Sequence, residues 1–128
     1  MKVYIVGNPL VKQDSLPFTL LPTLMDAFPD VMIEEADPNE NFVPEEGSVI
    51  VDTVEGIQDV QLFEDIDTFV TTKSVSPHDY DLGFHLQLLK KLHKLVRVTI
   101  IGVPAHDESG STGKQVIAAI RQIVSDVR

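Results

Sequence analysis

Two carboxylates and one imidazole stand at points of the sequence where an α/β fold would bring them together. Asp14 follows the first apolar run, Asp52 ends a later one, and His78 precedes a leucine-rich stretch. Carboxylate oxygens and imidazole nitrogens are ligands for zinc and nickel, and three of them leave coordination positions open for water or a substrate. The sequence therefore predicts a three-ligand metal site.

Each of these residues also has an ordinary structural role to weigh against metal binding. An aspartate at a strand end often caps a turn, so Asp52 alone fits either role. Asp14 alone is typical of a solvated loop acid. His78 could cap its own helix, although a helix N-terminus disfavours imidazolium and so holds the ring in the neutral form that binds metal. The prediction of a site rests on the three residues together.

The amino-acid composition excludes several kinds of active site and of binding partner. The chain has no cysteine, which excludes disulfides, thiolate metal sites and a cysteine nucleophile. Its formal net charge of −10 disfavours nucleic acid as a partner and favours partners with basic segments. No apolar run approaches the roughly 18 residues that span a bilayer, and the first one is too short for a secretory signal. We expect a cytoplasmic protein with no membrane partner.

The 128 residues fit one domain, 1–128, with an ordinary apolar fraction of 43%. Short β-branched runs alternate with helical patterns, which predicts an α/β domain of three layers: a mostly parallel twisted sheet of about five strands with helices on both faces. The expected strands are 2–6, 31–35, 48–52 and 96–101, the last ended by Gly102, with short elements at 60–63 and 68–72 and a long loop over 37–47.

Three helices are expected between these strands. The first begins after Ser15 as N-cap and stops before Pro29. The second begins at Ser76 and carries an apolar stripe of Leu82, Leu86, Leu89 and Leu92. The last places six apolar residues on one face: Val116, Ile117, Ile120, Ile123, Val124 and Val127. Since functional residues of open α/β sheets collect beyond the carboxyl ends of the strands, this order of elements lets Asp14, Asp52 and His78 converge.

The remaining polar signals are interpreted as structural. Glu108 stands where a phosphate-binding loop before Lys114 would need its first glycine, so we reject nucleotide binding. His85 fits a partly buried core histidine, and His93 fits a partner of the helix dipole. His106 fits a solvated loop, although it could line the cleft. Asn8 could orient Asp14 or donate to an oxyanion, but a turn residue explains it equally well.

Four motifs in this chain occur in the same order in a known family. They are Gly7–Leu10 with Asp14 four residues later, Val51–Thr53 after an apolar strand, Ser76–His78 before a leucine-rich helix, and Ile101–Val103. With the closing amphipathic helix, they resemble the nickel-iron hydrogenase maturation endopeptidases over most of the chain. Members of that family remove a short C-terminal extension from the hydrogenase large subunit after nickel has been inserted.

The resemblance implies that Asp14, Asp52 and His78 are the metal-contacting and catalytic residues, with no separate cofactor-binding set. It implies a peptidase whose partner is the precursor of a hydrogenase large subunit. The nickel would be supplied by that substrate, and zinc or another divalent metal could substitute.

Departures from the family pattern leave alternatives open. Ile5 stands where the family usually has glycine, Ser15–Pro17 replace the glycines after the first acid, and Asp37–Glu40 replace a glycine-rich motif. One alternative is a metal-dependent binding module that recognises an immature metalloenzyme without cutting it. Another is a small flavodoxin-like signalling domain, which the Ser-Pro-His run at 76–78 fits poorly.

Overall fold

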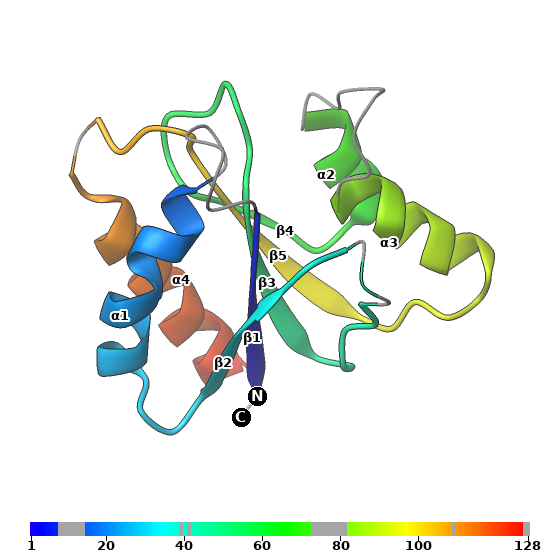
Figure 1. Ribbon diagram of the computed structural model, residues 1–128, viewed down its shortest axis with the longest axis horizontal. Helices are drawn as coiled ribbons and strands as arrows, with labels where there is room; N and C mark the ends of the chain where they lie inside the picture. Colours follow the sequence, from blue (N-terminus) through cyan, green and yellow to red (C-terminus); the bar gives the residue numbers. More distant parts are fainter. Residues whose placement is uncertain (8–14, 39, 41, 73–81, 109, 127–128) are drawn as a thin grey trace.

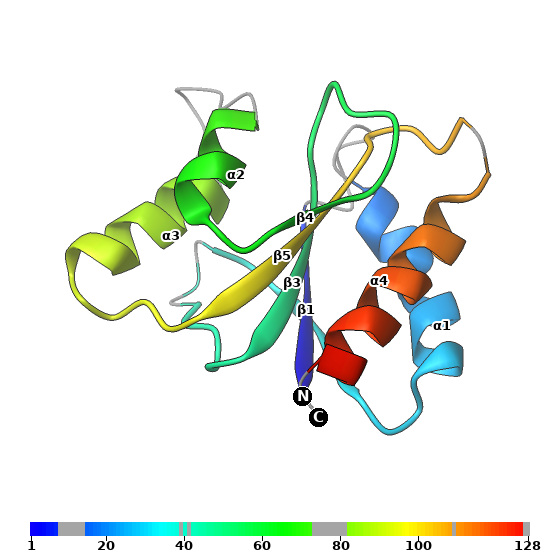
Figure 2. The ribbon, with the colours of Figure 1, turned by 180° about the vertical axis from the view of Figure 1, so that it is seen from behind.

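The computed structural model describes residues 1–7, 15–38, 40, 42–72, 82–108 and 110–126. Its elements in chain order are β1 (Lys2–Val6), α1 (Leu16–Ala27), β2 (Met32–Ala36), β3 (Ser48–Thr53), β4 (Gln61–Phe63), α2 (Ile66–Thr72), α3 (Leu82–Lys91), β5 (Val98–Val103) and α4 (Thr112–Asp126). The strands form one five-stranded sheet in the order β2-β1-β3-β5-β4, parallel except for β4. Helices α1 and α4 cover one face, and α2 and α3 cover the other (Figures 1 and 2). The expected α/β class is confirmed.

Strand β3 lies at the centre of this sheet, between β1 and β5, and all six of its residues are buried. Its side chains alternate between the two helix layers, as the strand period of two requires. Ile50 packs in the core under α2 and α3, while Val49 and Val51 pack in the core under α1 and α4. Each fully buried side chain of this kind contributes about 1.5–3 kcal/mol, which fixes the strand firmly in place.

Helix α1 begins and ends where the sequence predicts, before Pro29. Ser15 is the N-cap residue, but its side chain makes no capping hydrogen bond to the helix. Leu20 and Leu24 are buried against the sheet. Pro22 sits inside the helix, where it cannot donate a backbone hydrogen bond. Burial of the leucine stripe therefore outweighs the loss at Pro22.

The last strand differs from the prediction, because β5 runs from Val98 to Val103 and Gly102 lies inside it. Gly102 pairs with Asp52 of β3 on one side and with Gln61 of β4 on the other. A Cβ atom built on Gly102 would stand 2.9 Å from both Phe63 and Val54. Glycine is needed here for the close approach of the neighbouring segments and does not end the strand.

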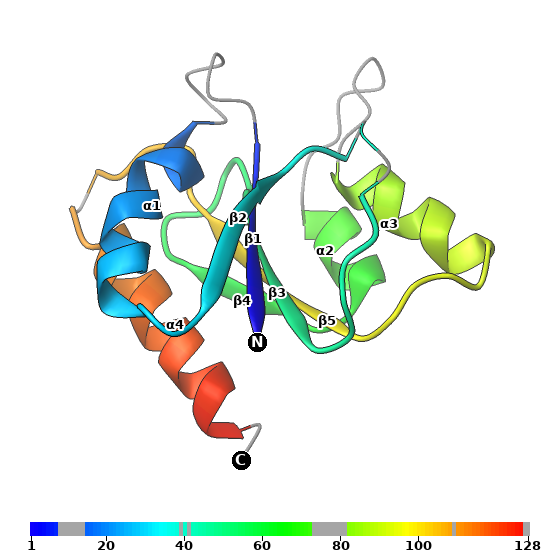
Figure 3. The ribbon, with the colours of Figure 1, turned by 60° about the horizontal axis from the view of Figure 1, so that its bottom comes forward.

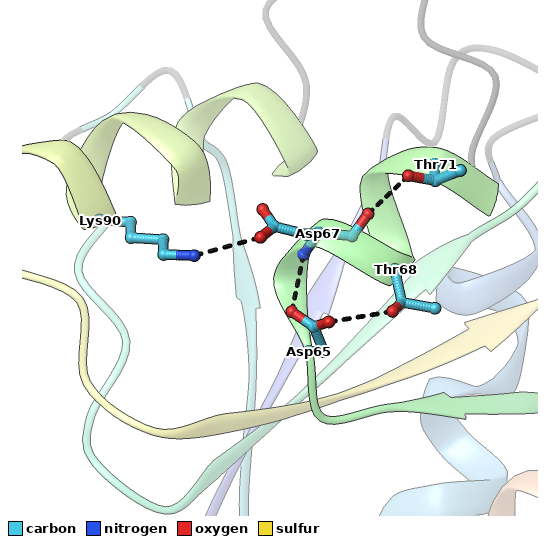
Figure 4. Close-up of polar contacts among 5 residues, drawn as sticks. All are labelled: Asp65, Asp67, Thr68, Thr71 and Lys90. Atoms are coloured by element: carbon cyan, nitrogen blue, oxygen red, sulfur yellow. Dashed lines mark hydrogen bonds and ion pairs between the residues drawn. The ribbon is translucent and has the colours of Figure 1, made fainter.

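The two short elements take different forms. Residues 60–63 contain β4, and the element expected at 68–72 is the end of helix α2. Asp65 caps α2: its carboxylate accepts hydrogen bonds of 3.0 Å from the backbone N–H of Asp67 and of 3.0 Å from the Thr68 hydroxyl (Figure 4). Lys90 of α3 forms an ion pair with Asp67, with Nζ and Oδ2 3.3 Å apart (Figure 4). This pair ties the two helices of the layer together.

Helix α3 is described from Leu82, so the predicted start at Ser76 lies outside the described residues. Leu82, Leu86 and Leu89 are buried as expected, but the prediction was wrong for Leu92, which is exposed. The reason is that α3 ends at Lys91 and the chain turns away at His93, whose φ is 58°. The N–H groups of His93 and Lys94 then bond to the carbonyls of residues 90 and 89, which is the Schellman arrangement.

Helix α4 buries Val116 and Ile120 against the sheet, and Ile117, Ile123 and Val124 pack at the margin of the same core. Val127 lies outside the described residues. Gly113 and Lys114, the two residues that resemble part of a phosphate-binding loop in sequence, belong to the first turn of α4. Among the described residues, no helix combines the length and the apolar character needed to cross a membrane.

Candidate functional site

The strand order makes the carboxyl ends of β1 and β3 the point at which the direction of winding of the sheet reverses. From β1 the chain passes through α1 to β2 on one side of the sheet, and then returns to β3 on the other side of β1. The next parallel strands in the chain after β1 and β3, which are β2 and β5, therefore lie on opposite sides of this pair. In open α/β sheets, this point of reversal at the carboxyl edge is where ligands bind.

Asp52 is at this edge, one residue before the end of β3. Asp52 is only 1% exposed, and it pairs with Gly102 of β5. A carboxylate with so little exposure is costly unless it is hydrogen-bonded or bound to a cation. Strand alternation puts Asp52 on the same face as Ile50, which packs under α2 and α3. Asp52 thus faces the layer whose helix α3 follows the segment that contains His78.

Thr53 adds a second polar group at the same edge, on the opposite face of β3. It is buried, and its Oγ1 has no hydrogen-bond partner among the described residues. A buried hydroxyl left unpaired costs about 1–3 kcal/mol, so this atom is a candidate binding group. Sequence reasoning included Thr53 in its motif but gave it no role. The available signal was its place after Asp52, since alternation directs adjacent residues to the two layers.

The other two predicted ligands, Asp14 and His78, lie outside the described residues. Within the part of the chain that the structure describes, no group of three His, Cys, Asp or Glu side chains could hold a metal ion. Figures 1 and 3 show that the amino end of α1, the carboxyl end of α2 and the amino end of α3 all lie toward the carboxyl edge of the sheet. Because Asp14 and His78 lie outside the described residues, the three-residue metal site stays a prediction.

A hollow of about 280 Å³ lies between the start of α1 and the loop after β5. It is lined by Ser15, Leu16 and Thr19 on one side and by residues 105–108 on the other. His106 lines this hollow and is exposed in the loop after β5, as the solvated-loop interpretation predicts. Asp107 has a structural role, because its Oδ1 accepts hydrogen bonds of 3.2 Å from the backbone N–H of Thr112 and of 2.7 Å from its hydroxyl.

His85 belongs to the core and not to the candidate site, as predicted. It is buried, its Nε2 is hydrogen-bonded to the backbone carbonyl of Phe42, and its ring stacks on that of Phe42 with centroids 6.0 Å apart. A larger hollow of about 490 Å³ lies by the start of β5, between Asp65 and Arg97. It is at the opposite end of β5 from Gly102 and so is separate from Asp52.

Comparison with known proteins connects this fold to a class of protease. No model of a known protein family matches the sequence, and no curated protein matches it. An uncharacterized protein from Wolinella succinogenes has a similar structure, with a TM-score of 0.67 and 13% identity over 99% of this chain and 98% of its own.

Two further solved structures with this fold are hydrogenase maturation proteases. The hydrogenase maturating endopeptidase HybD from E. coli has a TM-score of 0.59 and 19% identity, over 95% of this chain and 93% of its own. The [NiFe] hydrogenase maturation protease HycI from Thermococcus kodakarensis KOD1 has a TM-score of 0.59 and 18% identity, over 97% and 92%. The chain thus has the fold of the hydrogenase maturation endopeptidases across nearly its whole length.

Proposed function

We propose that this chain is a cytoplasmic endopeptidase that removes the C-terminal extension of a nickel-iron hydrogenase large-subunit precursor after nickel insertion. The observation that carries the proposal is the fold shared with HybD and HycI over more than nine-tenths of each chain. Fold alone does not define an activity. The burial of Asp52 at the carboxyl edge of the central strand adds a group that can do chemistry at the expected place.

In this proposal Asp14, Asp52 and His78 contact the nickel that the precursor carries. Two carboxylate oxygens and an imidazole nitrogen fit nickel or zinc, and the ion would polarise the scissile carbonyl or acidify a water. Asp52 offers a carboxylate held in a fixed position by its strand. Asp14, where it does not coordinate, would act as a general base. His78 must be neutral to coordinate, so nickel recognition should weaken below about pH 6.

The nickel would make the enzyme a checkpoint for the state of its substrate. Three protein ligands with open positions bind an exchangeable metal only moderately, whereas a metal already anchored in the precursor could complete its shell from this site. The purified enzyme should therefore contain little metal. It should cut nickel-loaded precursor and leave nickel-free precursor intact.

The test is to incubate the purified chain with nickel-loaded and nickel-free large-subunit precursor and to follow the mass of the precursor. Asp52→Asn should abolish cleavage of the loaded form, and His78→Ala should do the same with little loss of stability. Asp26→Asn is the matched control: it removes one carboxylate charge from an exposed position on α1 and should leave cleavage unchanged. Asp14→Asn should lower kcat more than binding if Asp14 is the base.

The outcomes of this assay test the nickel checkpoint and the peptidase activity separately. Rapid cleavage of nickel-free precursor by metal-stripped enzyme would refute the checkpoint and the assignment of the three residues. Binding of the loaded precursor with no change in its mass would refute the peptidase and favour the non-cleaving binding module instead.

A further inference from the structure

The loop between β3 and β4, residues 54–60, lies at the carboxyl edge of the sheet. It begins two residues after Asp52, and Figures 1 and 2 show it beyond the carboxyl ends of the strands. Most of its residues between 55 and 59 are exposed. The loop therefore borders the place that the proposed function assigns to the C-terminal extension of the precursor.

This loop is held to neighbouring elements along its length. At its start, the N–H of Val54 donates a hydrogen bond of 2.8 Å to the carbonyl of Val103, and Val54 is buried. In its middle, Ile57 packs against the core under α2 and α3. At its end, the N–H of Val60 donates a hydrogen bond of 2.8 Å to Oε1 of Gln115 in α4. The last of these contacts comes from a side chain 55 residues away in the sequence.

Gln115 uses both ends of its side-chain amide in this position. While Oε1 accepts from Val60, Nε2 donates hydrogen bonds of 3.3 Å to Oδ1 of Asp59 and of 3.1 Å to Oγ of Ser111. The amides of asparagine and glutamine are the side-chain groups that carry one acceptor oxygen and two donor hydrogens on one plane. One amide therefore ties two consecutive loop residues to the first turns of α4.

We propose that Gln115 is a positioning residue for the cleavage of the precursor, an inference that rests on the proposed function. Its amide holds loop 54–60 as a fixed wall at the carboxyl edge, against which the C-terminal extension of the precursor lies. A wall that is already fixed in the free protein does not have to be ordered when the extension binds, so less binding free energy is lost. Gln115 acts through Asp59 and Val60 and does not itself touch the reacting atoms.

The experiment measures KM and kcat for the nickel-loaded precursor, together with the hydrogen exchange of the loop amides. Gln115→Leu nearly keeps the size of the side chain and removes its three hydrogen bonds. It should raise KM about three- to tenfold, the range that the net value of one hydrogen bond corresponds to, with kcat unchanged. The Val60 amide should exchange faster with solvent.

Gln122→Leu is the matched control for this substitution. Gln122 lies on the same helix, and its Nε2 likewise donates a hydrogen bond to an aspartate, 3.0 Å from Oδ1 of Asp126. It stands about 10 Å further along α4 than Gln115, from the rise of 1.5 Å per residue. This variant should leave both KM and the exchange of the Val60 amide unchanged.

A reciprocal exchange of the two polar groups tests whether the hydrogen bonds themselves are responsible. Gln115→Glu alone places a second carboxylate beside Asp59 and should raise KM as Gln115→Leu does. Adding Asp59→Asn supplies an amide donor at position 59 for the carboxylate at 115, which still accepts from the Val60 N–H, and it restores the formal charge of the pair. The double variant should therefore recover most of the wild-type KM and the slow exchange.

The outcomes separate this inference from the proposed function. Faster exchange of the Val60 amide in Gln115→Leu with a KM equal to that of Gln122→Leu would overturn the positioning role and leave the peptidase standing. Unchanged exchange, or a raised KM that the double variant does not lower, would overturn it as well. Precursor that binds the wild type without being cut would overturn the peptidase. A Kd that rises in Gln115→Leu and recovers in the double variant would still support the loop as a wall of the binding site.

Discussion

Replacing Gly102 with alanine should destabilise the protein although it adds only one methyl group. The new Cβ would stand 2.9 Å from Phe63 Cε2 and 2.9 Å from Val54 Cγ2. Carbon atoms pack best at about 3.5–4.0 Å, so each neighbour would have to move by roughly 0.6–1 Å. Both neighbours are themselves buried, which leaves them little room. Overpacking of this kind costs about 1–3 kcal/mol, or a fall in Tm of roughly 4–12 °C for a chain of this size.

Urea unfolding of the two proteins, analysed at constant m, would measure the loss. Gly113→Ala is the matched control, because its Cβ would meet Leu20 at an ordinary 3.6 Å and the residue lies in helix α4. This control should gain about 0.5–1 kcal/mol, since alanine favours helix over glycine. Adding Phe63→Leu should recover part of the loss in Gly102→Ala by removing one of the two crowded atoms. Equal stability of Gly102→Ala and the wild type would refute the packing argument.

Three further substitutions test other parts of the fold by the same urea assay. His85→Ala should cost about 1–3 kcal/mol and leave cleavage intact, because it removes the ring that stacks on Phe42 and bonds its carbonyl; lost cleavage with unchanged stability would contradict the core assignment. His93→Gly should stabilise by about 0.5–1 kcal/mol, since φ there is 58° and glycine adopts that conformation without strain; a loss would show that the ring has a partner worth more than the strain. Asp107→Ala should cost about 0.5–2 kcal/mol by removing the acceptor of the Thr112 N–H, whereas Asp107→Asn should retain most of that stability.

The fold could be predicted from the sequence where local pattern and burial agree. The continuous apolar run of β3 and the leucine stripe of α1 both lie in the core, so periodicity located them well. The predictions failed where tertiary packing decides. The sequence predicts that the strand ends at Gly102, but β4 pairs with β5 at this residue and β5 continues to Val103. Leu92 continues the stripe of α3 in sequence, but the left-handed turn at His93 ends the helix first.

The candidate site could be predicted less completely than the fold, because its members come from separate loops. Asp52 was found because it ends a recognisable strand, and the structure buries it at the carboxyl edge. Thr53 was given no role, because its place after Asp52 was its one signal in the sequence and only the structure shows that its hydroxyl is buried without a partner among the described residues. Asp14 and His78 rest on motif spacing alone, because both lie outside the described residues.

The register of β3 decides toward which helix layer each of the two polar residues at its carboxyl end, Asp52 and Thr53, is directed. Asp52 shares its face with the core under α2 and α3, and Thr53 shares its face with the core under α1 and α4. A slip by one residue would exchange the two, because strand side chains alternate with a period of two. The buried pairs of Val51 with Ile5 of β1 and with Ile101 of β5 hold the register from both sides. The apolar packing that holds β3 in this register therefore directs the Asp52 carboxylate toward the layer of α3 and the Thr53 hydroxyl toward the layer of α1.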